Sequence, residues 1–293
     1  MKRPFSSFIL RCIAAFTMTL DHVAKMIQVF LTPTGGLSIA CNVLSIIGRI
    51  AYPVFLFLLV EGFVYTKNLK KYMLRMGIMA AIIYAGFVGA TFVIGDGISY
   101  ILIYLGNIFI DLLLFLVFFY FIFHENKKLR WLSILPFIYN LLILLIQNFY
   151  IPYFTGLALN LTAGLFAQYA VLNVFIFPLY PALYYLVSFI QKKIRHSEES
   201  IPSFKNSSFN VRVIVFTILV TILGVLCHVF TYFPKLFSAI NFVTQTYMLI
   251  ALPFILLYNG KKGFSNKISQ IAFYLYYPLH LVIIFSVVYL ISL

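Results

Sequence analysis

The chain has 293 residues, of which 63% are hydrophobic and only 10% are charged, whereas about a quarter of the residues of a soluble domain are charged. This composition excludes a soluble globular protein and indicates a multi-pass membrane protein. The net charge of +14 is spread along the chain instead of gathered in one basic patch, so we expect no nucleic-acid partner.

The apolar runs predict an all-α fold. A helix needs about 20 apolar residues to cross the hydrocarbon core of a bilayer, and the runs of this sequence predict nine such helices, with ten as the alternative count. The predicted spans are 8–31, 43–66, 76–94, 100–123, 131–149, 168–190, 212–232, 239–258 and 271–291. We treat residues 1–293 as a single transmembrane domain. The segment 151–167 is too apolar for an exposed loop and short for a span, which indicates a re-entrant half-helix.

Lysine and arginine predict the orientation, because they favour cytoplasmic loops. With the N-terminus in the cytoplasm, most of the 21 basic residues fall on the inner side of the nine spans. The three cysteines are Cys12, Cys41 and Cys227, and none forms a Cys-x-x-Cys motif. An odd number in or beside spans predicts neither a disulfide framework nor a metal site.

The first span carries ionisable residues in the stretch MTLDHVAKMI, at positions 18 to 27. A charge deep in a bilayer costs about 2.5–3.5 kcal/mol on insertion scales, so such residues face a partner or a cavity. Asp21 and Lys25 are four residues apart and are expected to form a local ion pair. His22 and Arg11 are eleven residues apart, which places them on one helix face.

The depth of each residue suggests its partner in the second span. At 1.5 Å of rise per residue, His22 lies roughly 21 Å from the inner edge and Arg49 roughly 9 Å from the outer edge, so the two are at similar depth. Arg11 and Glu61 both lie near the cytoplasmic edge. Because consecutive spans are usually neighbours, we predict the pairs His22 with Arg49 and Arg11 with Glu61.

Two further ionisable residues lie within predicted spans. Asp111 is in the middle of NIFIDLLLF, and His280 is near the middle of the last span in FYLYYPLHLVII. Ionisable residues inside a membrane segment mark a functional site by default. We therefore expect Asp111, His280 and the neighbouring Tyr277 to line a substrate pocket.

Three blocks of the sequence resemble the TraX family, a group similar to the membrane acyltransferase-3 superfamily and named for a conjugation protein that acetylates the N-terminus of pilin. The blocks are LDH in the first span, GRIAYPVFLFLLVEGFVYTKNLKKYMLR at 48–75 and YNGKKGFSNKISQIAFYLYYPLHLVII at 258–284. The resemblance implies a multi-pass acyltransferase of the bacterial cytoplasmic membrane that uses acetyl-CoA as its acyl donor.

The resemblance also suggests roles for the residues singled out above. His22 would be the general base or a transient acyl acceptor, and Arg49 would stabilise the donor or the oxyanion. Asp21 would neutralise Lys25 or tune the histidine. The chemistry agrees, because acyl transfer needs a base and a fixed positive charge. The residues expected to attract or contact acetyl-CoA from the inner side are Arg11, Glu61, Lys67, Lys71 and Arg75.

Several functions remain open from the sequence. The acceptor would be an amine of a peptide or protein, or else a hydroxyl of an envelope glycan or lipid. Buried histidine, arginine and aspartate would also suit the ion relay of a transporter. A non-catalytic membrane partner is a further alternative.

Overall fold

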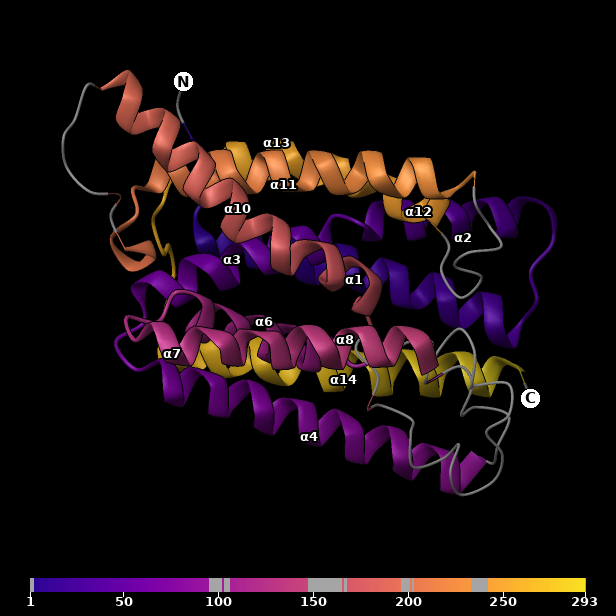
Figure 1. Ribbon diagram of the computed structural model, residues 1–293. Coiled ribbons are helices and arrows are strands. Elements are labelled where there is room, and N and C mark those ends of the chain that lie inside the picture. Colours follow the sequence, from indigo (N-terminus) through magenta and orange to yellow (C-terminus); the bar gives the residue numbers. More distant parts are fainter. Residues whose placement is uncertain are drawn as a thin grey trace. The chain divides into compact units, whose positions relative to one another are not determined.

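The part of the chain that the structure describes is built from helices (Figure 1). The computed structural model describes residues 3–94, 102, 106–146, 165, 168–195, 201, 203–232 and 242–292. Its elements are α1 (Ser7–Phe30), α2 (Gly35–Gly48), α3 (Ala51–Tyr65), α4 (Leu69–Ile94), α6 (Ile108–Ile122), α7 (Lys127–Arg130), η1 (Trp131–Ser133), α8 (Ile134–Leu145), α10 (Ala170–Ile194), η4 (Phe204–Asn206), α11 (Phe209–Phe230), α12 (Phe242–Thr246), η5 (Tyr247–Ala251), α13 (Leu252–Leu256) and α14 (Lys267–Ser292). Within these ranges, the only extended pairing is an isolated parallel bridge between Phe5 and Tyr258.

Seven helical segments in the described ranges are long and apolar enough to cross a membrane, which confirms an all-helical, multi-pass membrane protein. They are Ser7–Phe30, Gly35–Tyr65, Leu69–Phe92, Lys127–Leu145, Ala170–Ile194, Phe209–Phe230 and Lys267–Ser292. Two shorter apolar helices, Ile108–Ile122 and Thr244–Leu256, fall within the remaining two predicted spans. The count of nine and the orientation stay predictions. The expected re-entrant segment 151–167 lies outside the described residues, apart from Leu165.

The second predicted span begins earlier than expected. Its helical segment runs from Gly35 to Tyr65, whereas the hydropathy pattern placed the start at residue 43. The segment is interrupted after Gly48, where α2 ends and α3 begins at Ala51. Arg49 is the C-cap of α2, and its backbone N–H donates to the carbonyl oxygens of residues 46 and 47. This break places the arginine side chain beside α1.

The contacts divide the chain into two compact units, each described by itself. The first unit consists of residues 1–58, 220–234 and 241–293, and the second consists of residues 59–219 and 235–240. Two of the boundaries fall inside α3 and α11, so each of these helices contributes residues to both units.

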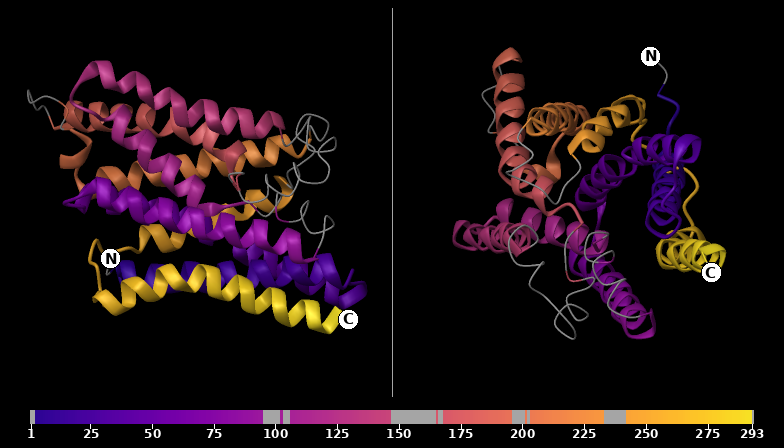
Figure 2. Two further views of the ribbon diagram at one scale, coloured as in Figure 1. Left: turned by 90° about the horizontal axis from the view of Figure 1, so that it is seen from below. Right: turned by 90° about the vertical axis from the view of Figure 1, so that its right-hand side faces the viewer.

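In the first unit, α1 packs against both α2 and α14. Figure 2 shows α14, in yellow, running beside the indigo α1. The two helices are parallel, because Phe8 near the start of α1 contacts Phe273 while Phe30 at its end contacts Phe285. This pairing aligns the middle of α1 with the middle of α14.

The close approach of α1 and α2 requires a glycine. A Cβ atom added at Gly48 would lie 2.3 Å from the Cβ atom of Asp21 and 3.2 Å from its Cα atom. Both neighbours are at or next to the backbone of α1, so the helices would have to move apart to admit a methyl group. Gly48 therefore sets the distance between Asp21 and the end of α2.

In the second unit, α6 contacts α4, α8 and α10, and α8 also packs against α10. Aromatic rings fill the space between α6, α10 and η4. Phe119 is fully buried and stacks on Phe115, with 4.4 Å between the ring centroids. Phe204 of η4 stacks on Phe123 at 4.3 Å, so the 3₁₀ turn is held against the end of α6.

We expect Gly48→Ala to lower the free energy of unfolding by about 1–3 kcal/mol, the usual cost of overpacking a close contact. The matched control is Gly36→Ala in the same helix, where an added Cβ atom meets nothing within 4 Å. That variant should be neutral or slightly stabilising, because alanine favours helix. Thermal unfolding of the purified variants in detergent measures both. Equal stability of the two variants would contradict the close-packing explanation.

Candidate functional site

Two histidines from opposite ends of the sequence meet in the first unit. His22 of α1 and His280 of α14 are 2% and 5% exposed. Their Nδ1 and Nε2 atoms, respectively, are 2.7 Å apart, which is a hydrogen bond between the rings. The Nδ1 atom of His280 lies 2.9 Å from the carbonyl oxygen of Tyr276. The parallel packing of α1 and α14 produces this pair, because it brings residues 258 positions apart to the same height.

Tyrosines next to His280 hold both imidazole rings. The ring of Tyr276 is stacked with His280 at 5.1 Å and 12°, and its hydroxyl is hydrogen-bonded to Thr19 of α1. The ring of Tyr277 meets His22 and His280 edge-on, at 6.1 and 5.3 Å. Tyr277 and His280 were both predicted to line a substrate pocket, and the structure brings both to His22.

A charged cluster lies one residue before His22. Lys25 Nζ is 2.8 Å from Asp21 Oδ2, which confirms the predicted local pair, and Arg49 Nη2 donates to Asp21 Oδ1. Arg49 Nε also donates to the carbonyl oxygen of Ser45, at 3.0 Å. Asp21 is the only acidic residue in the sequence of the first unit. Two cations share this carboxylate, so the three side chains together carry a net charge of +1.

The prediction that His22 pairs with Arg49 is wrong, because each residue has a different partner. Arg49 reaches the expected turn of α1, but it binds Asp21, whose side chain points about 100° away from that of His22 around the helix. Depth along a span gives the height of a residue and leaves its direction around the helix axis undetermined. His22 is instead hydrogen-bonded to His280 of α14, on another side of α1.

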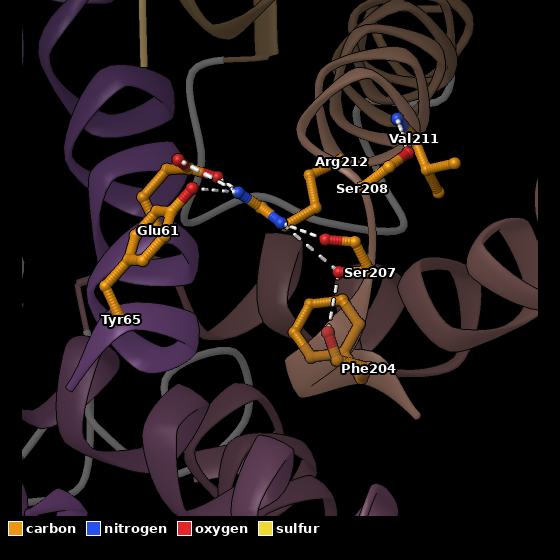
Figure 3. Close-up of polar contacts among 7 residues, drawn as sticks. All are labelled: Glu61, Tyr65, Phe204, Ser207, Ser208, Val211 and Arg212. Atoms are coloured by element: carbon orange, nitrogen blue, oxygen red, sulfur yellow. Dashed lines mark hydrogen bonds and ion pairs between the residues drawn. The ribbon is translucent and has the colours of Figure 1, made fainter. Parts of the chain in front are cut away.

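Glu61 belongs to a second buried centre, in the second unit, where its partner is Arg212 (Figure 3). Arg212 Nε is 2.5 Å from Glu61 Oε1, and Nη2 donates to Glu61 Oε2 at 3.3 Å and to the hydroxyl of Tyr65 at 3.0 Å. Nη1 donates to the backbone carbonyl and to the hydroxyl of Ser207. All five guanidinium N–H groups therefore have acceptors.

The predicted pair of Arg11 with Glu61 is thus wrong. Arg11 Nη2 donates to the hydroxyl of Ser7, and its guanidinium lies over the ring of Phe273. Arg212 is the first residue of the predicted span 212–232, and the structure places it inside α11 with 2% exposure. The sequence does hold a signal that Arg212 is buried, because the residue lies at the start of the apolar run VRVIVFTILV. The buried guanidinium joins α3 to the residues before α11, and the role of Glu61 in acetyl-CoA binding stays a prediction.

Asp111 caps a helix of the second unit. It is 1% exposed and accepts hydrogen bonds from the backbone N–H groups of Gln168 and Tyr169, at 2.8 and 3.1 Å, just before α10 begins. The side chain of Asn173 donates to it at 2.7 Å and also to Asn140 of α8. A carboxylate at a helix N-terminus is stabilised by the unpaired N–H groups and by the helix dipole. This network ties α6, α8 and α10 together, and a role in a substrate pocket stays a prediction.

The predicted acetyl-CoA contacts Lys67, Lys71 and Arg75 lie around the start of α4, in the second unit. Lys67 and Lys71 are exposed, and the guanidinium of Arg75 lies over the ring of Tyr72, 5.8 Å from its centroid. The exposure of the two lysines is compatible with attracting an anionic donor, and the role of all three residues stays a prediction.

A family model described as TraX protein matches residues 6–194, which include the first two of the three resembling blocks. Among curated proteins, the probable fimbrial assembly protein FimC, serogroup H1, of Dichelobacter nodosus is 40% identical over 72 residues. This match covers 25% of the chain and 27% of the relative, so it spans about a quarter of that protein. No solved structure matches the chain.

The Glu61–Arg212 centre predicts a pattern of stabilities. Glu61→Leu should lower the free energy of unfolding by about 3–5 kcal/mol, because it leaves a buried guanidinium without its carboxylate. Glu61→Leu combined with Arg212→Leu should be more stable than the single variant, since both charges are then removed. Chemical or thermal unfolding in detergent tests this order. A double variant less stable than Glu61→Leu would contradict the assignment.

Proposed function

Because the chain belongs to the TraX family, we propose that it is a membrane acyltransferase that moves an acetyl group from acetyl-CoA to an amine of a peptide or protein. The acceptor we favour is a pilus subunit. The family is named for a conjugation protein that acetylates pilin, and the similar protein of Dichelobacter nodosus is named as a probable fimbrial assembly protein.

The observation that carries this proposal is that His22, a buried imidazole hydrogen-bonded to a second imidazole, directly follows the aspartate of a positive cluster in α1. His22 contacts His280 on one side and follows Asp21, which binds Lys25 and Arg49, in the sequence. A neutral imidazole is a suitable base at physiological pH. The net charge of +1 on the cluster is suited to a reaction in which negative charge develops on an oxygen atom.

The proposed reaction has one nucleophile, one base and one leaving group. The amine nitrogen attacks the thioester carbonyl carbon and forms the C–N bond, while His22 removes the proton from that nitrogen. The carbonyl oxygen becomes negative in the tetrahedral intermediate, where Arg49 and Lys25 stabilise it through their positive field. The C–S bond then breaks, and the CoA thiolate leaves and takes up the proton held by His22.

The charged cluster also explains why an aspartate is present. Asp21 holds Arg49 and Lys25 in place and cancels one of their two charges, so the site keeps a single net positive charge. Lys25 is the more accessible of the two cations, with 29% of its side chain exposed. Fixed cations lower the barrier because they need no reorganisation when the oxyanion forms.

His22→Asn tests the proposal. The short amide retains a hydrogen-bonding group close to the position of Nδ1 and lacks the basic Nε2 atom. Acetyl transfer from acetyl-CoA to pilin peptides, followed by intact mass, should fall by about 10²–10⁴-fold, the usual contribution of a general base. The matched control is His228→Asn on α11, an exposed histidine whose loss should leave transfer unchanged.

Other outcomes distinguish the alternatives. Acetyl groups found on hydroxyls of envelope glycans or lipids, and not on amines, would replace the peptide acceptor and keep the acyltransferase. Ion flux in proteoliposomes without binding of acetyl-CoA would replace the enzyme with a transporter. Equal transfer by the parent and the His22→Asn variant would overturn the role of His22.

A further inference from the structure

We propose that His280 is a positioning residue that fixes the tautomer of His22, with the proton on Nδ1 and the basic lone pair on Nε2. The tautomer follows from the hydrogen bonds between α1 and α14 alone. The catalytic meaning of the Nε2 lone pair rests on the function proposed above.

His22, His280 and the backbone carbonyl of Tyr276 form a series of two hydrogen bonds, and the carbonyl at its end determines the direction of both. The carbonyl oxygen of Tyr276 can only accept, so the Nδ1 atom of His280, 2.9 Å away, must carry a proton and donate it. A neutral imidazole has one N–H group, so the Nε2 atom of His280 is an acceptor. The Nδ1 atom of His22 lies 2.7 Å from this acceptor and must therefore donate. The lone pair of His22 is left on Nε2.

These hydrogen-bond directions hold when His280 is neutral, and the surroundings of His280 favour that state. Both rings are buried, and an unpaired buried cation is costly. Asp21, which precedes His22, binds Lys25 and Arg49, and these three side chains together already carry one positive charge. A protonated His280 would add a second positive charge beside them without a carboxylate of its own.

The ring of His280 is held so that it cannot easily turn. Thr19 donates its hydroxyl proton to the carbonyl oxygen of Ala15, at 2.9 Å, so the hydroxyl of Tyr276 must donate to Thr19. This bond fixes Tyr276, which stacks on His280 and also supplies the carbonyl acceptor. Tyr277 makes T-shaped ring contacts with both imidazoles.

The two hydrogen bonds cannot carry a proton beyond His280, because the last acceptor is a backbone carbonyl. When Nε2 of His22 takes up a proton, the Nδ1–H group can share the new charge with Nε2 of His280. The next link is a backbone carbonyl, which has no proton to pass on. The pair is therefore suited to a base that takes up and returns one proton, and is poorly suited to a continuous proton relay.

Nitrogen-15 NMR of the histidine side chains tests the tautomer directly. In the full chain, labelled with ¹⁵N-histidine and reconstituted in lipid nanodiscs, we expect His22 and His280 to give the pattern of Nδ1–H, Nε2-lone-pair imidazoles. The His22 signal is assigned by its loss in His22→Asn. In His280→Leu, which removes the acceptor, His22 should shift to a mixture of tautomers.

Acetyl transfer gives the second readout. His280→Leu should lower kcat by about 10²-fold with little change in KM for acetyl-CoA, because only the orientation of the base is lost. His280→Gln should fall by less, since its amide can accept from His22 and donate to Tyr276. A higher kcat for His280→Gln than for His280→Leu, together with an Nδ1–H signal on His22 in the glutamine variant, would support the positioning role of His280.

Three results would overturn either the proposed tautomer or the proposed function. An Nε2–H tautomer of His22 in the parent protein would overturn the proposal. So would His280→Leu with an unchanged His22 tautomer and undiminished transfer. A parent protein with the Nδ1–H tautomer but no acetyl transfer to any acceptor would support the hydrogen-bond chain and overturn the proposed function instead.

Discussion

The cost of placing charge inside a membrane segment governs the arrangement of this protein. Each charged residue in a span must find a partner, because lipid offers none. Asp21 is the single carboxylate in the sequence of the first unit, and it binds both Arg49 and Lys25. Arg49 reaches this carboxylate from the break between α2 and α3, and Gly48, which precedes it, allows the end of α2 to approach Asp21 closely.

The two buried ionic centres, Glu61–Arg212 and Asp21–Lys25–Arg49, both pair charges inside spans, but they differ in net charge. The guanidinium of Arg212 has an acceptor for each of its N–H groups, and its charge is balanced by Glu61. Such a centre joins chain segments and has no donor left for a substrate. The cluster at Asp21 keeps a net positive charge and adjoins a histidine. This difference in charge balance separates a structural centre from a candidate reactive one.

Sequence reasoning identified most of the residues of the candidate site but few of their partners. His22, Arg49, Asp21, Tyr277 and His280 were all singled out, because ionisable residues are conspicuous in apolar spans. The Asp21–Lys25 pair was predicted because both residues lie on one helix, four positions apart. Arg212 was missed as a partner of Glu61, since 151 residues separate them and its place at the edge of a span resembled a loop position.

The sequence by itself determined that the protein is helical, crosses the membrane several times and carries a charged first span, because composition and helical period depend on local residue types. Only the tertiary structure decided which side chains meet. The rotation of each helix about its axis, and the parallel packing of α14 on α1, select His280 for His22 and Asp21 for Arg49. Those choices depend on the packing of segments far apart in the chain, which hydropathy does not encode.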